Sequence, residues 1–352
     1  MSELNQHFYS DLAQQCGAVQ IACLHPDPGL EEKLRAQMQA YLSSEQGSAL
    51  PYLQRQSKIL QSPFSDRPWA RSLLLISFQA KKQAELPFSA LPAAREGHPK
   101  ASLAAYILNE DYHRSGVRIL QKIAALLCLD EYEFGVDSSP LLEKALAQQA
   151  GLGQYGYNSL LRCNGFGTRL HLGFLFSAKA LPIQRYVAEM KPDCADCRLC
   201  IQNCPNSALS DSGILQIRRC RSYLANEKKG ALSWQEQIWL GGSLAGCSLC
   251  SYCCPDDQSP RPADLLLDPE ELCLMPSAEL KALIQGSILQ HLGVSRLKRN
   301  AAAALAIQLP AQEAEAMQQK LLSSNQSPAL RQTIAAWQQH TGNSTRSENN
   351  RL

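Results

Sequence analysis

The sequence predicts a mixed fold in three parts: an α/β region first, then a loop-rich module, then a helical segment. Apolar runs of strand length alternate with amphipathic stretches before residue 185. Cysteine is concentrated between Cys194 and Cys254, and helical patterns broken by Gly, Pro or Ser follow Asp268. We therefore expect an α/β domain over 1–185, a cysteine module over 186–262, a helical domain over 263–340 and a disordered tail over 341–352.

The first region alternates helical and strand signals. Residues 30–42 read as an amphipathic helix, and the apolar run SLLLISF at 72–78 is typical of a buried strand. Helices are expected over 117–129 and 141–150. A strand ending in a turn is expected over 134–140, and HLGFLFS within 170–177 predicts another strand. These elements together predict an α/β domain.

Two cysteine runs dominate the middle of the chain. The first, CADCRLCIQNCP, has the CxxCxxCxxxCP spacing of bacterial ferredoxins, in which the fourth cysteine binds the other cluster of a two-cluster fold. The second is CSLCSYCCP, and the isolated Cys220 lies between the two runs. We therefore predict a ferredoxin-like module that binds two 4Fe-4S clusters.

The spacing also predicts which cysteine binds which cluster. The first cluster takes three cysteines of the first run and the Cys-Pro cysteine of the second; the second cluster takes the remaining four. The predicted ligands are Cys194, Cys197, Cys200 and Cys254 for cluster 1, and Cys204, Cys220, Cys247 and Cys250 for cluster 2. Cys253 is left as a spare, because the step from Cys250 to Cys254 and Pro255 repeats that from Cys200 to Cys204 and Pro205.

Two other uses of the cysteines fit the sequence less well. Structural zinc binds paired CxxC motifs, but it does not explain a four-cysteine run ending in proline. Disulfides belong to oxidising compartments, and the first residues, MSELNQHFYSDLAQQ, have no apolar core of a signal peptide. No run of about 18 apolar residues is present. We expect a soluble, cytoplasmic protein without a membrane segment.

The last region reads as short antiparallel helices. Its helical patterns cover 278–285, 299–307, 311–322 and 329–340. Such a series is typical of a HEAT-like helical repeat. The net charge of +2 shows no global field that would attract a polyanion.

A pair of clusters forms a one-electron relay, and a relay needs something to reduce. The nearly two hundred residues before the clusters favour an enzyme over a simple electron carrier. A nicotinamide site is not indicated, because the glycine-rich GLGQYG at 151–156 follows a predicted helix, whereas the dinucleotide fingerprint requires a preceding strand.

Several motifs in the same order resemble the epoxyqueuosine reductase family. They are Asp-Tyr-His at 111–113, Val-Asp-Ser-Ser-Pro at 136–140, LLEKALAQQAGLG at 141–153, the CxxCxxCxxxCP run, Arg-Cys-Arg-Ser-Tyr at 219–223, Gly-Cys-x-x-Cys at 246–250 and GSILQHLGVSRLKRN at 286–300. The resemblance covers nearly the whole chain, and this shared order is more specific than any single motif.

The resemblance implies an oxidoreductase that removes the epoxide oxygen of epoxyqueuosine in tRNA to give queuosine. It implies that the N-terminal domain is a corrinoid-binding domain that holds a cobalamin. It also implies that the clusters deliver electrons to the cobalt. It also implies a monomer that binds the tRNA anticodon stem-loop and receives electrons from a flavodoxin or ferredoxin reductase system. Opening an epoxide leaves an alkoxide that needs a proton.

The resemblance also implies residue roles. Asp137 matches the family's proton donor; by local sequence alone, an aspartate there is more often a turn residue or helix cap. Positions expected to contact the cofactor are Tyr112, His113, Ser159, Ser222 and Gly246.

This chain departs from the family pattern at several positions. Gln154 and Tyr157 stand where the family has tryptophan and lysine, and Phe174 replaces a glutamate. Basic residues are missing before Tyr106 and at 109–110, and Asp256 follows the last Cys-Pro in place of tryptophan. Two alternatives stay open: a corrinoid-dependent reductase of a small molecule, and a non-catalytic iron–sulfur electron-transfer protein.

Overall fold

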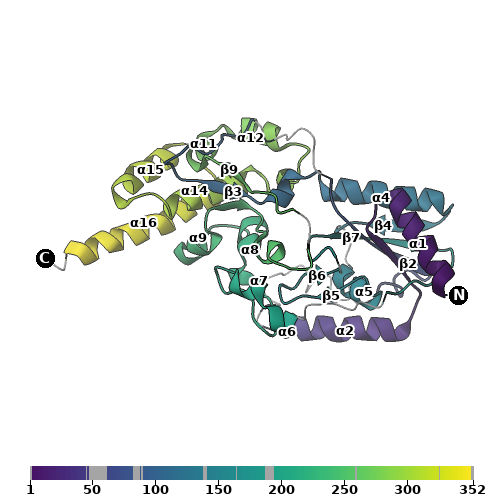
Figure 1. The fold of residues 1–352 in the computed structure, drawn as a ribbon. Helices are drawn as coiled ribbons and strands as arrows, with labels where there is room; N and C mark the ends of the chain where they lie inside the picture. Colours follow the sequence, from purple (N-terminus) through teal and green to yellow (C-terminus); the bar gives the residue numbers. More distant parts are fainter. Residues whose placement is uncertain are drawn as a thin grey trace.

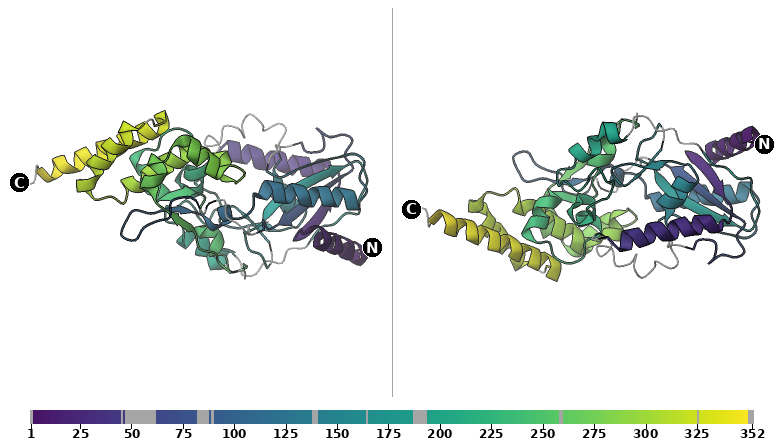
Figure 2. Two further views of the ribbon diagram at one scale, coloured as in Figure 1. Left: turned by 90° about the horizontal axis from the view of Figure 1, so that it is seen from above. Right: turned by 90° about the horizontal axis from the view of Figure 1, so that it is seen from below.

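The computed structural model describes residues 2–44, 46, 62–81, 88, 90–137, 141–163, 165–186, 194–257, 260–324 and 326–349. Figure 1 shows an elongated molecule with an α/β region at one end, a helical region at the other, and the cysteine-bearing loops between them. The two further views in Figure 2 also place the termini at opposite ends. Within the described ranges, every helix is too short or too polar to cross a membrane.

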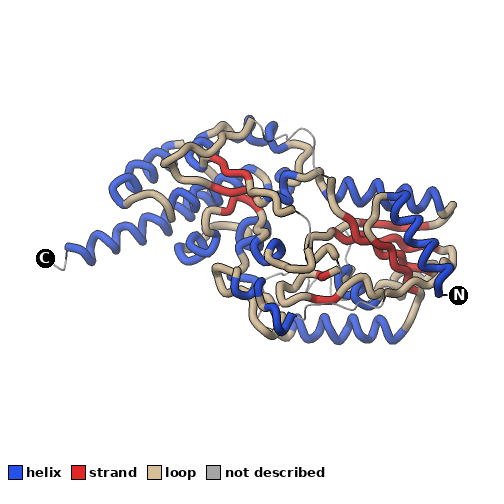
Figure 3. Tube along the Cα trace, in the orientation of Figure 1, coloured by secondary structure: helices blue, strands red, loops and turns tan. Residues whose placement is uncertain are grey.

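A four-stranded sheet forms the centre of the α/β region (Figure 3). Its strand order is β1-β2-β7-β4, and every neighbouring pair is antiparallel. The strands are β1 (Gln20–Leu24), β2 (Ser72–Phe78), β7 (His171–Ser177) and β4 (Tyr132–Gly135). The strands predicted over 72–78 and 170–177 are confirmed. All seven residues of β2 are buried, which explains their continuous apolar run.

Helices cover both faces of this sheet. On one face, α1 (Ser2–Cys16) and α4 (Tyr112–Leu126) pack against Leu74 and Ile76; on the other, α2 (Pro28–Leu42) and α5 (Glu143–Gln149) pack against Leu73 and Leu75. Successive side chains of β2 therefore enter opposite cores. The predicted mixed α/β region is confirmed as three layers. The turn predicted over 134–140 lies partly outside the described residues, which omit 138–140.

The middle of the chain is built from short elements joined by loops. They are β5 (Gln154–Tyr155), β6 (Leu161–Arg162), α6 (Cys194–Cys197), α7 (Leu199–Gln202), η3 (Ile217–Arg219), α8 (Arg221–Asn226), α9 (Trp234–Leu240) and α10 (Leu249–Tyr252). Metal ligation commonly replaces an apolar core in such a module.

A second sheet joins distant parts of the chain. Its order is β8-β3-β9, with β3 (Ala101–Leu103) between β8 (Ser243–Ala245) and β9 (Leu265–Leu267). β3 and the following η2 (Ala105–Leu108) belong to the range assigned to the N-terminal domain, yet they pack in the core of the C-terminal helices. Buried residues such as Leu103 and Ile107 reach apolar neighbours there.

The C-terminal region is helical, as predicted. Its helices are α11 (Pro269–Leu274), α12 (Ser277–Ile284), α13 (Leu289–Leu292), α14 (Val294–Ala306), α15 (Ala311–Ser323) and α16 (Pro328–Asn349). Leu330, Ile334 and Trp337 anchor α16 in the core. The helix continues to Asn349, into the segment expected to be a disordered tail, because elongating a packed helix is easier than starting one.

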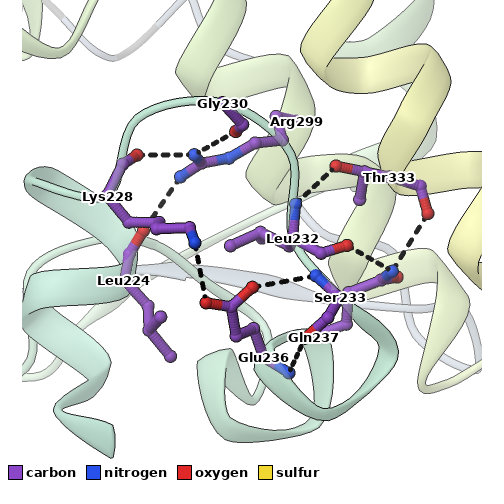
Figure 4. A network of polar contacts seen from close by, with 9 residues as sticks. All are labelled: Leu224, Lys228, Gly230, Leu232, Ser233, Glu236, Gln237, Arg299 and Thr333. Carbon is purple, nitrogen blue, oxygen red and sulfur yellow. Dashed lines mark hydrogen bonds and ion pairs between the residues drawn. The ribbon is translucent and has the colours of Figure 1, made fainter. Parts of the chain in front are cut away.

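Two buried polar residues of α14 connect this helix to the cysteine module. The Arg299 guanidinium donates hydrogen bonds to the backbone carbonyls of Leu224, Lys228 and Gly230 (Figure 4). The side-chain amide of Asn300 donates to the carbonyls of Ala225 and Leu244 at 3.0 and 2.8 Å. These bonds fix α8, the loop after it and β8 against one helix.

Figure 4 also shows how α9 is attached to α16. The backbone N–H of Leu232 donates to the Thr333 hydroxyl at 3.0 Å, and the amide of Gln237 donates to the carbonyls of Leu232 and Thr333. Ser233 and Glu236 form a capping box at the start of α9.

We predict that Asn300→Ala lowers the free energy of unfolding by about 2–4 kcal/mol, because two buried carbonyls lose their donors. Urea unfolding followed by circular dichroism measures the change. The control is Gln308→Ala, which removes an exposed amide that bonds to the Lys100 carbonyl and should change stability by less than about 1 kcal/mol. Equal effects of the two substitutions would contradict the importance of burial.

Candidate active site and cluster-binding residues

The structure brings the predicted cluster 1 cysteines together around one pocket. Its lining includes Cys194, Cys197, Cys200 and Cys254, together with Cys250, which is assigned to cluster 2. Burial raises the pKa of the Cys200 thiol to about 11, and the nearby Cys253 and Cys194 add to this increase. Burial likewise raises the pKa of Cys254, with a smaller contribution from Cys194. Cysteines from both runs thus meet at one place.

The predicted cluster 2 cysteines also influence one another electrostatically. Burial raises the pKa of Cys220, and Cys204 adds to the increase. Burial is again the main cause for Cys247, followed among the cysteines by Cys220 and Cys204. The pKa of Cys250 is raised by burial, then by Cys247 and Cys220. The isolated Cys220, which caps the start of α8, therefore lies among the other three.

Cys253, which is assigned to neither cluster, lies near the cysteines assigned to cluster 1. Its side chain is buried, and its Sγ donates a hydrogen bond to the Cys250 carbonyl at 3.4 Å. All fourteen cysteines fall within the described ranges, and all are free of disulfides.

The buried Arg162 makes the pocket of the cluster 1 cysteines suitable for an anionic cluster. Its guanidinium is buried, forms an ion pair with Asp256, and donates from Nη1 to Cys194 Sγ at 3.3 Å. Its Nη2 is buried without a hydrogen-bond partner among the described residues. Arg162 lines the same pocket as the four cysteines. A positive charge and an unused donor beside four thiol ligands fit a 4Fe-4S cluster, whose sulfurs accept hydrogen bonds.

Asp137 follows β4 in a strained backbone conformation. Its φ is 49°, a left-handed value that is unfavourable for most non-glycine residues. The side chain is exposed, and its Oδ2 accepts a hydrogen bond from the Tyr112 hydroxyl at 2.7 Å. The backbone N–H of Asp137 donates to Glu143 Oε1 at 3.1 Å. The carboxylate is therefore presented to solvent from a fixed position.

Aromatic rings support the Tyr112 side of this site. Tyr112 stacks on His171 with ring centroids 4.3 Å apart and on His113 at 4.1 Å. The loss of surrounding water lowers the pKa of His171 to about 4, so this ring is neutral near pH 7. Burial and the Asp137 carboxylate raise the pKa of Tyr112 far above its usual range. Tyr112 therefore remains a hydrogen-bond donor.

His113 belongs to a group that crosses between the two ends of the molecule. Asp111 caps α4 and accepts hydrogen bonds from the backbone N–H and Nδ1 of His113, at 3.0 and 2.8 Å. Nε2 of His291, on α13, lies 3.5 Å from Asp111 Oδ2. Burial opposes ionisation of Asp111, but the bonds from His113 outweigh it and lower the Asp111 pKa. One side-chain atom able to bind a metal from each of Asp111, His113 and His291 lies within 4.8 Å of the other two.

Glu143, at the start of α5, lies near Asp137 and has a strongly raised pKa. Burial raises the pKa of Glu143 to about 8, and the negative charge of Asp137 adds to the increase. Glu143 therefore carries a proton near neutral pH while it accepts the hydrogen bond from the Asp137 backbone.

Ser159, Ser222 and Gly246 are the other residues predicted to contact the cofactor. The carbonyl of Ser159 accepts a hydrogen bond from Lys144 Nζ at 3.1 Å, and its hydroxyl donates to the Gly213 carbonyl. Ser222 hydrogen-bonds to the Tyr106 hydroxyl, which also influences the pKa of Tyr112.

Gly246 also lies close to the Tyr106 hydroxyl. It has a φ of 72°, and a Cβ there would lie 2.4 Å from the Tyr106 Oη. Tyr106 thus contacts the segments that carry Cys220 and Cys247 and lies near enough to Tyr112 to raise its pKa.

Sequence reasoning missed Tyr106, Glu143, His171, Arg162 and His291 as members of these sites. In the sequence, only the missing basic residue before it distinguishes Tyr106. Glu143 follows Asp137 by six residues in a helix start, where an acidic residue is common. No spacing rule relates the other three to the cysteines or to Asp137, since each arrives from a different element.

Comparisons with known proteins agree with this geometry. The family model for a 4Fe-4S double cluster binding domain matches residues 193–257, within the predicted cysteine module. Epoxyqueuosine reductase of Escherichia coli is 30% identical over 285 residues, which cover 76% of this chain and 73% of the relative.

The chain belongs to the epoxyqueuosine reductase family. The family inferred from the motifs is thus confirmed. The Pseudomonas aeruginosa epoxyqueuosine reductase is 35% identical over 220 residues, covering 58% of this chain and 60% of that relative, so the chain spans less than two thirds of this relative's length.

Solved structures share the fold of this epoxyqueuosine reductase family member. A selenomethionine-labelled epoxyqueuosine reductase matches with a TM-score of 0.75 at 20% identity, covering 95% of this chain and 90% of that one. An epoxyqueuosine reductase with an epoxyqueuosine-modified tRNA-Tyr stem loop matches with a TM-score of 0.69 at 19% identity, covering 96% and 98%.

We predict that a carboxylic acid titrates near pH 8 in the folded protein and is lost in Glu143→Gln. Its band is followed by infrared spectroscopy between pH 5 and 9. The folded protein holds this proton more tightly than the unfolded chain, whose glutamate has the ordinary pKa of 4.5. The protonated group therefore makes its full contribution to the free energy of unfolding below about pH 4.5, and this contribution is lost as the pH rises through 8. Wild type should therefore lose more stability than Glu143→Gln between pH 5 and 8.

The control for this titration is Glu32→Gln, which changes an exposed glutamate on α2 and should leave the band near pH 8 unchanged. A wild-type protein without a carboxylic acid band at pH 7 would show that Glu143 is ionised there.

Proposed function

We propose that this protein is an epoxyqueuosine reductase that acts on tRNA. The observation that carries the proposal is the exposed Asp137, which accepts a hydrogen bond from the Tyr112 hydroxyl. Tyr106 lies near enough to raise the pKa of Tyr112, and its own pKa is raised in part by the cysteines assigned to cluster 2. An epoxide reduction needs electrons and a proton at one place, and this arrangement brings a proton donor and an electron relay together. The names and folds of the relatives support the same reaction.

A corrinoid supplies reduced cobalt, a strong nucleophile or one-electron donor, when it is bound. Tyr112, His113, Ser159, Ser222 and Gly246 are the residues proposed to contact it. They come from the α/β region and the cysteine module, so the corrinoid would lie between these two parts of the chain. The rings of His113 and His171 both stack on Tyr112 and hold it in place. The aromatic and basic residues that this chain lacks leave fewer side chains to hold the corrinoid.

The clusters are held by two sets of cysteines in this proposal. Cys194, Cys197, Cys200 and Cys254 bind cluster 1, and Cys204, Cys220, Cys247 and Cys250 bind cluster 2. Arg162 offsets the negative charge of cluster 1. Cluster 2 would lie on the active-site side, because Ser222 and Gly246, close in sequence to its cysteines, contact the Tyr106 hydroxyl. Electrons from an external donor, a flavodoxin or ferredoxin reductase system, would therefore reach the site through cluster 2.

In this mechanism the carboxylic acid form of Asp137 gives its proton to the oxygen released from the epoxide and becomes a carboxylate, and a second proton from solvent completes the water that leaves. Tyr112 orients the carboxyl group through its 2.7 Å hydrogen bond. Glu143 retains a proton up to about pH 8 beside the Asp137 backbone, so it adds no second negative charge at neutral pH. A fold match also exists to a Bacillus subtilis epoxyqueuosine reductase described with its catalytic aspartate loop swung out of the active site, which supports a functional aspartate on a loop.

We predict that Asp137→Asn reduces turnover of epoxyqueuosine tRNA by about 10²-fold or more, since removing a general acid commonly has this effect. Mass spectrometry of the nucleosides measures turnover, and visible absorption measures the clusters, which should not change. Tyr112→Phe keeps the carboxyl group and should cause a smaller loss. Wild-type turnover by Asp137→Asn would remove Asp137 from the mechanism.

We predict that Cys220→Ala lowers the iron content from about eight to about four per chain after anaerobic purification, because one cluster loses a ligand. Cys253→Ala is the matched control and should keep about eight irons. Full iron in Cys220→Ala together with a loss in Cys253→Ala would reverse the assignment of these two cysteines.

Corrinoid content, measured in the same samples, separates the proposed enzyme from the electron-carrier alternative. A protein with full iron that binds no cobalamin would favour the carrier. A corrinoid-loaded protein that leaves epoxyqueuosine tRNA unchanged would favour a reductase of a small molecule.

A further inference from the structure

A positively charged hollow lies away from the cysteines, where the loop after α8 meets the starts of α14 and α16. Its volume is about 180 Å³. Basic side chains line it together with Ser295, and no acidic residue is among its described lining residues. The basic residues are Lys229, Arg296 and Arg299. Lys229 and Ser295 are exposed, so the hollow is open to solvent.

The two arginines of this hollow differ from the arginines of the described chain that form ion pairs. Six arginines pair with carboxylates: Arg67, Arg95, Arg118, Arg162, Arg169 and Arg198. Arg296 instead donates to the Asn226 carbonyl, and Arg299 donates to three carbonyls and to the Asn300 side chain. Among the described residues, neither arginine forms an ion pair with a carboxylate.

The charges in the hollow destabilise one another. Burial and, to a smaller extent, the nearby Arg296 together lower the pKa of Arg299 to about 10. Glu236 opposes the shift, but its carboxylate is paired with Lys228 at 2.9 Å. An anion in the hollow would relieve this repulsion.

The start of α14 adds to the positive potential. This 13-residue helix begins at Val294, and no side chain caps its N-terminus. Ser295 and Arg296, in its first turn, line the hollow. Backbone N–H groups and the helix dipole favour a negative charge at such a position.

The hollow is linked to the Asp111–His113–His291 group through α13. Leu292, one of its lining residues, directly follows His291 in this helix. His291 lies 3.5 Å from Asp111, the cap of the helix that carries Tyr112. The hollow therefore belongs to the same part of the fold as this group, and an extended ligand is the kind that contacts both.

We propose that this hollow binds a backbone phosphate of the RNA substrate. The inference rests on the proposed function, which supplies a polyanion that extends beyond the reacting nucleoside. Lys229, Arg296 and the N-terminus of α14 can contact phosphate oxygens without reading a base. The buried Arg299, whose N–H groups are all used by protein oxygens, contributes only its charge. The open rim favours a phosphate within a chain over an enclosed small anion.

The test is binding of a tRNA anticodon stem-loop by fluorescence anisotropy between 50 and 200 mM salt. Lys229→Ala should weaken binding and reduce the slope of log affinity against log salt by about 0.7–0.9, the value for one lost phosphate contact. The affinity of wild type should therefore fall about threefold more than that of the variant across this range. Lys229→Arg should keep the wild-type slope. The matched control is Lys281→Ala, an exposed lysine on α12 outside the hollow.

The effect of Lys229→Ala should be equal for modified and unmodified stem-loops, because a phosphate contact carries no information about the base. An unchanged affinity and slope in Lys229→Ala overturns the inference, as does a variant that loses only binding of inorganic phosphate. Failure of the proposed function gives a different result: wild type leaves the epoxide intact, while the salt slope still distinguishes Lys229→Ala from wild type.

Discussion

The arrangement of the cysteine module depends on the buried Arg299–Asn300 pair of α14. Together these side chains satisfy carbonyls at the end of α8, in the following loop and in β8. Cys220 immediately precedes α8, and Cys247 lies two residues after β8. A buried guanidinium without a carboxylate is unfavourable unless all its donors are used, and here they are. The helical region is thus part of the framework that sets the spacing of the cluster 2 cysteines.

Burial and neighbouring charges have different consequences at the cysteines and at Asp137. At the cysteines, burial and mutual proximity favour thiols over thiolates, so the metal must supply the energy that deprotonates its ligands. Loading of the clusters and ordering of these loops are therefore expected to be coupled. At Asp137, Glu143 stays neutral and Tyr112 donates a hydrogen bond, so a single exposed carboxyl group dominates the chemistry.

Local patterns allowed much of the fold to be predicted. β2 and β7 are continuous apolar runs because helices cover both faces of the sheet, and α2, α15 and α16 follow their amphipathic patterns. The cysteine grouping could be inferred because ligand spacing is fixed by cluster geometry.

What could not be predicted depends on contacts between distant residues. The antiparallel order of the main sheet, the insertion of β3 into the C-terminal core and the position of Tyr106 between two modules have no local signature. Arg162 and Glu143 likewise acquire their roles only through burial beside particular neighbours.

The path of the segment containing β3 has a mechanical consequence. This segment leaves the α/β region, is clamped between β8 and β9, and returns to α4 through only three residues after η2. The two ends of the molecule are therefore interlaced, and a fragment ending near residue 185 would lose the partners that cover Leu103 and Ile107. A bulky substrate must then be admitted by local movement of surface loops rather than by wide opening of the two ends, and cutting the chain between its regions should yield pieces that aggregate.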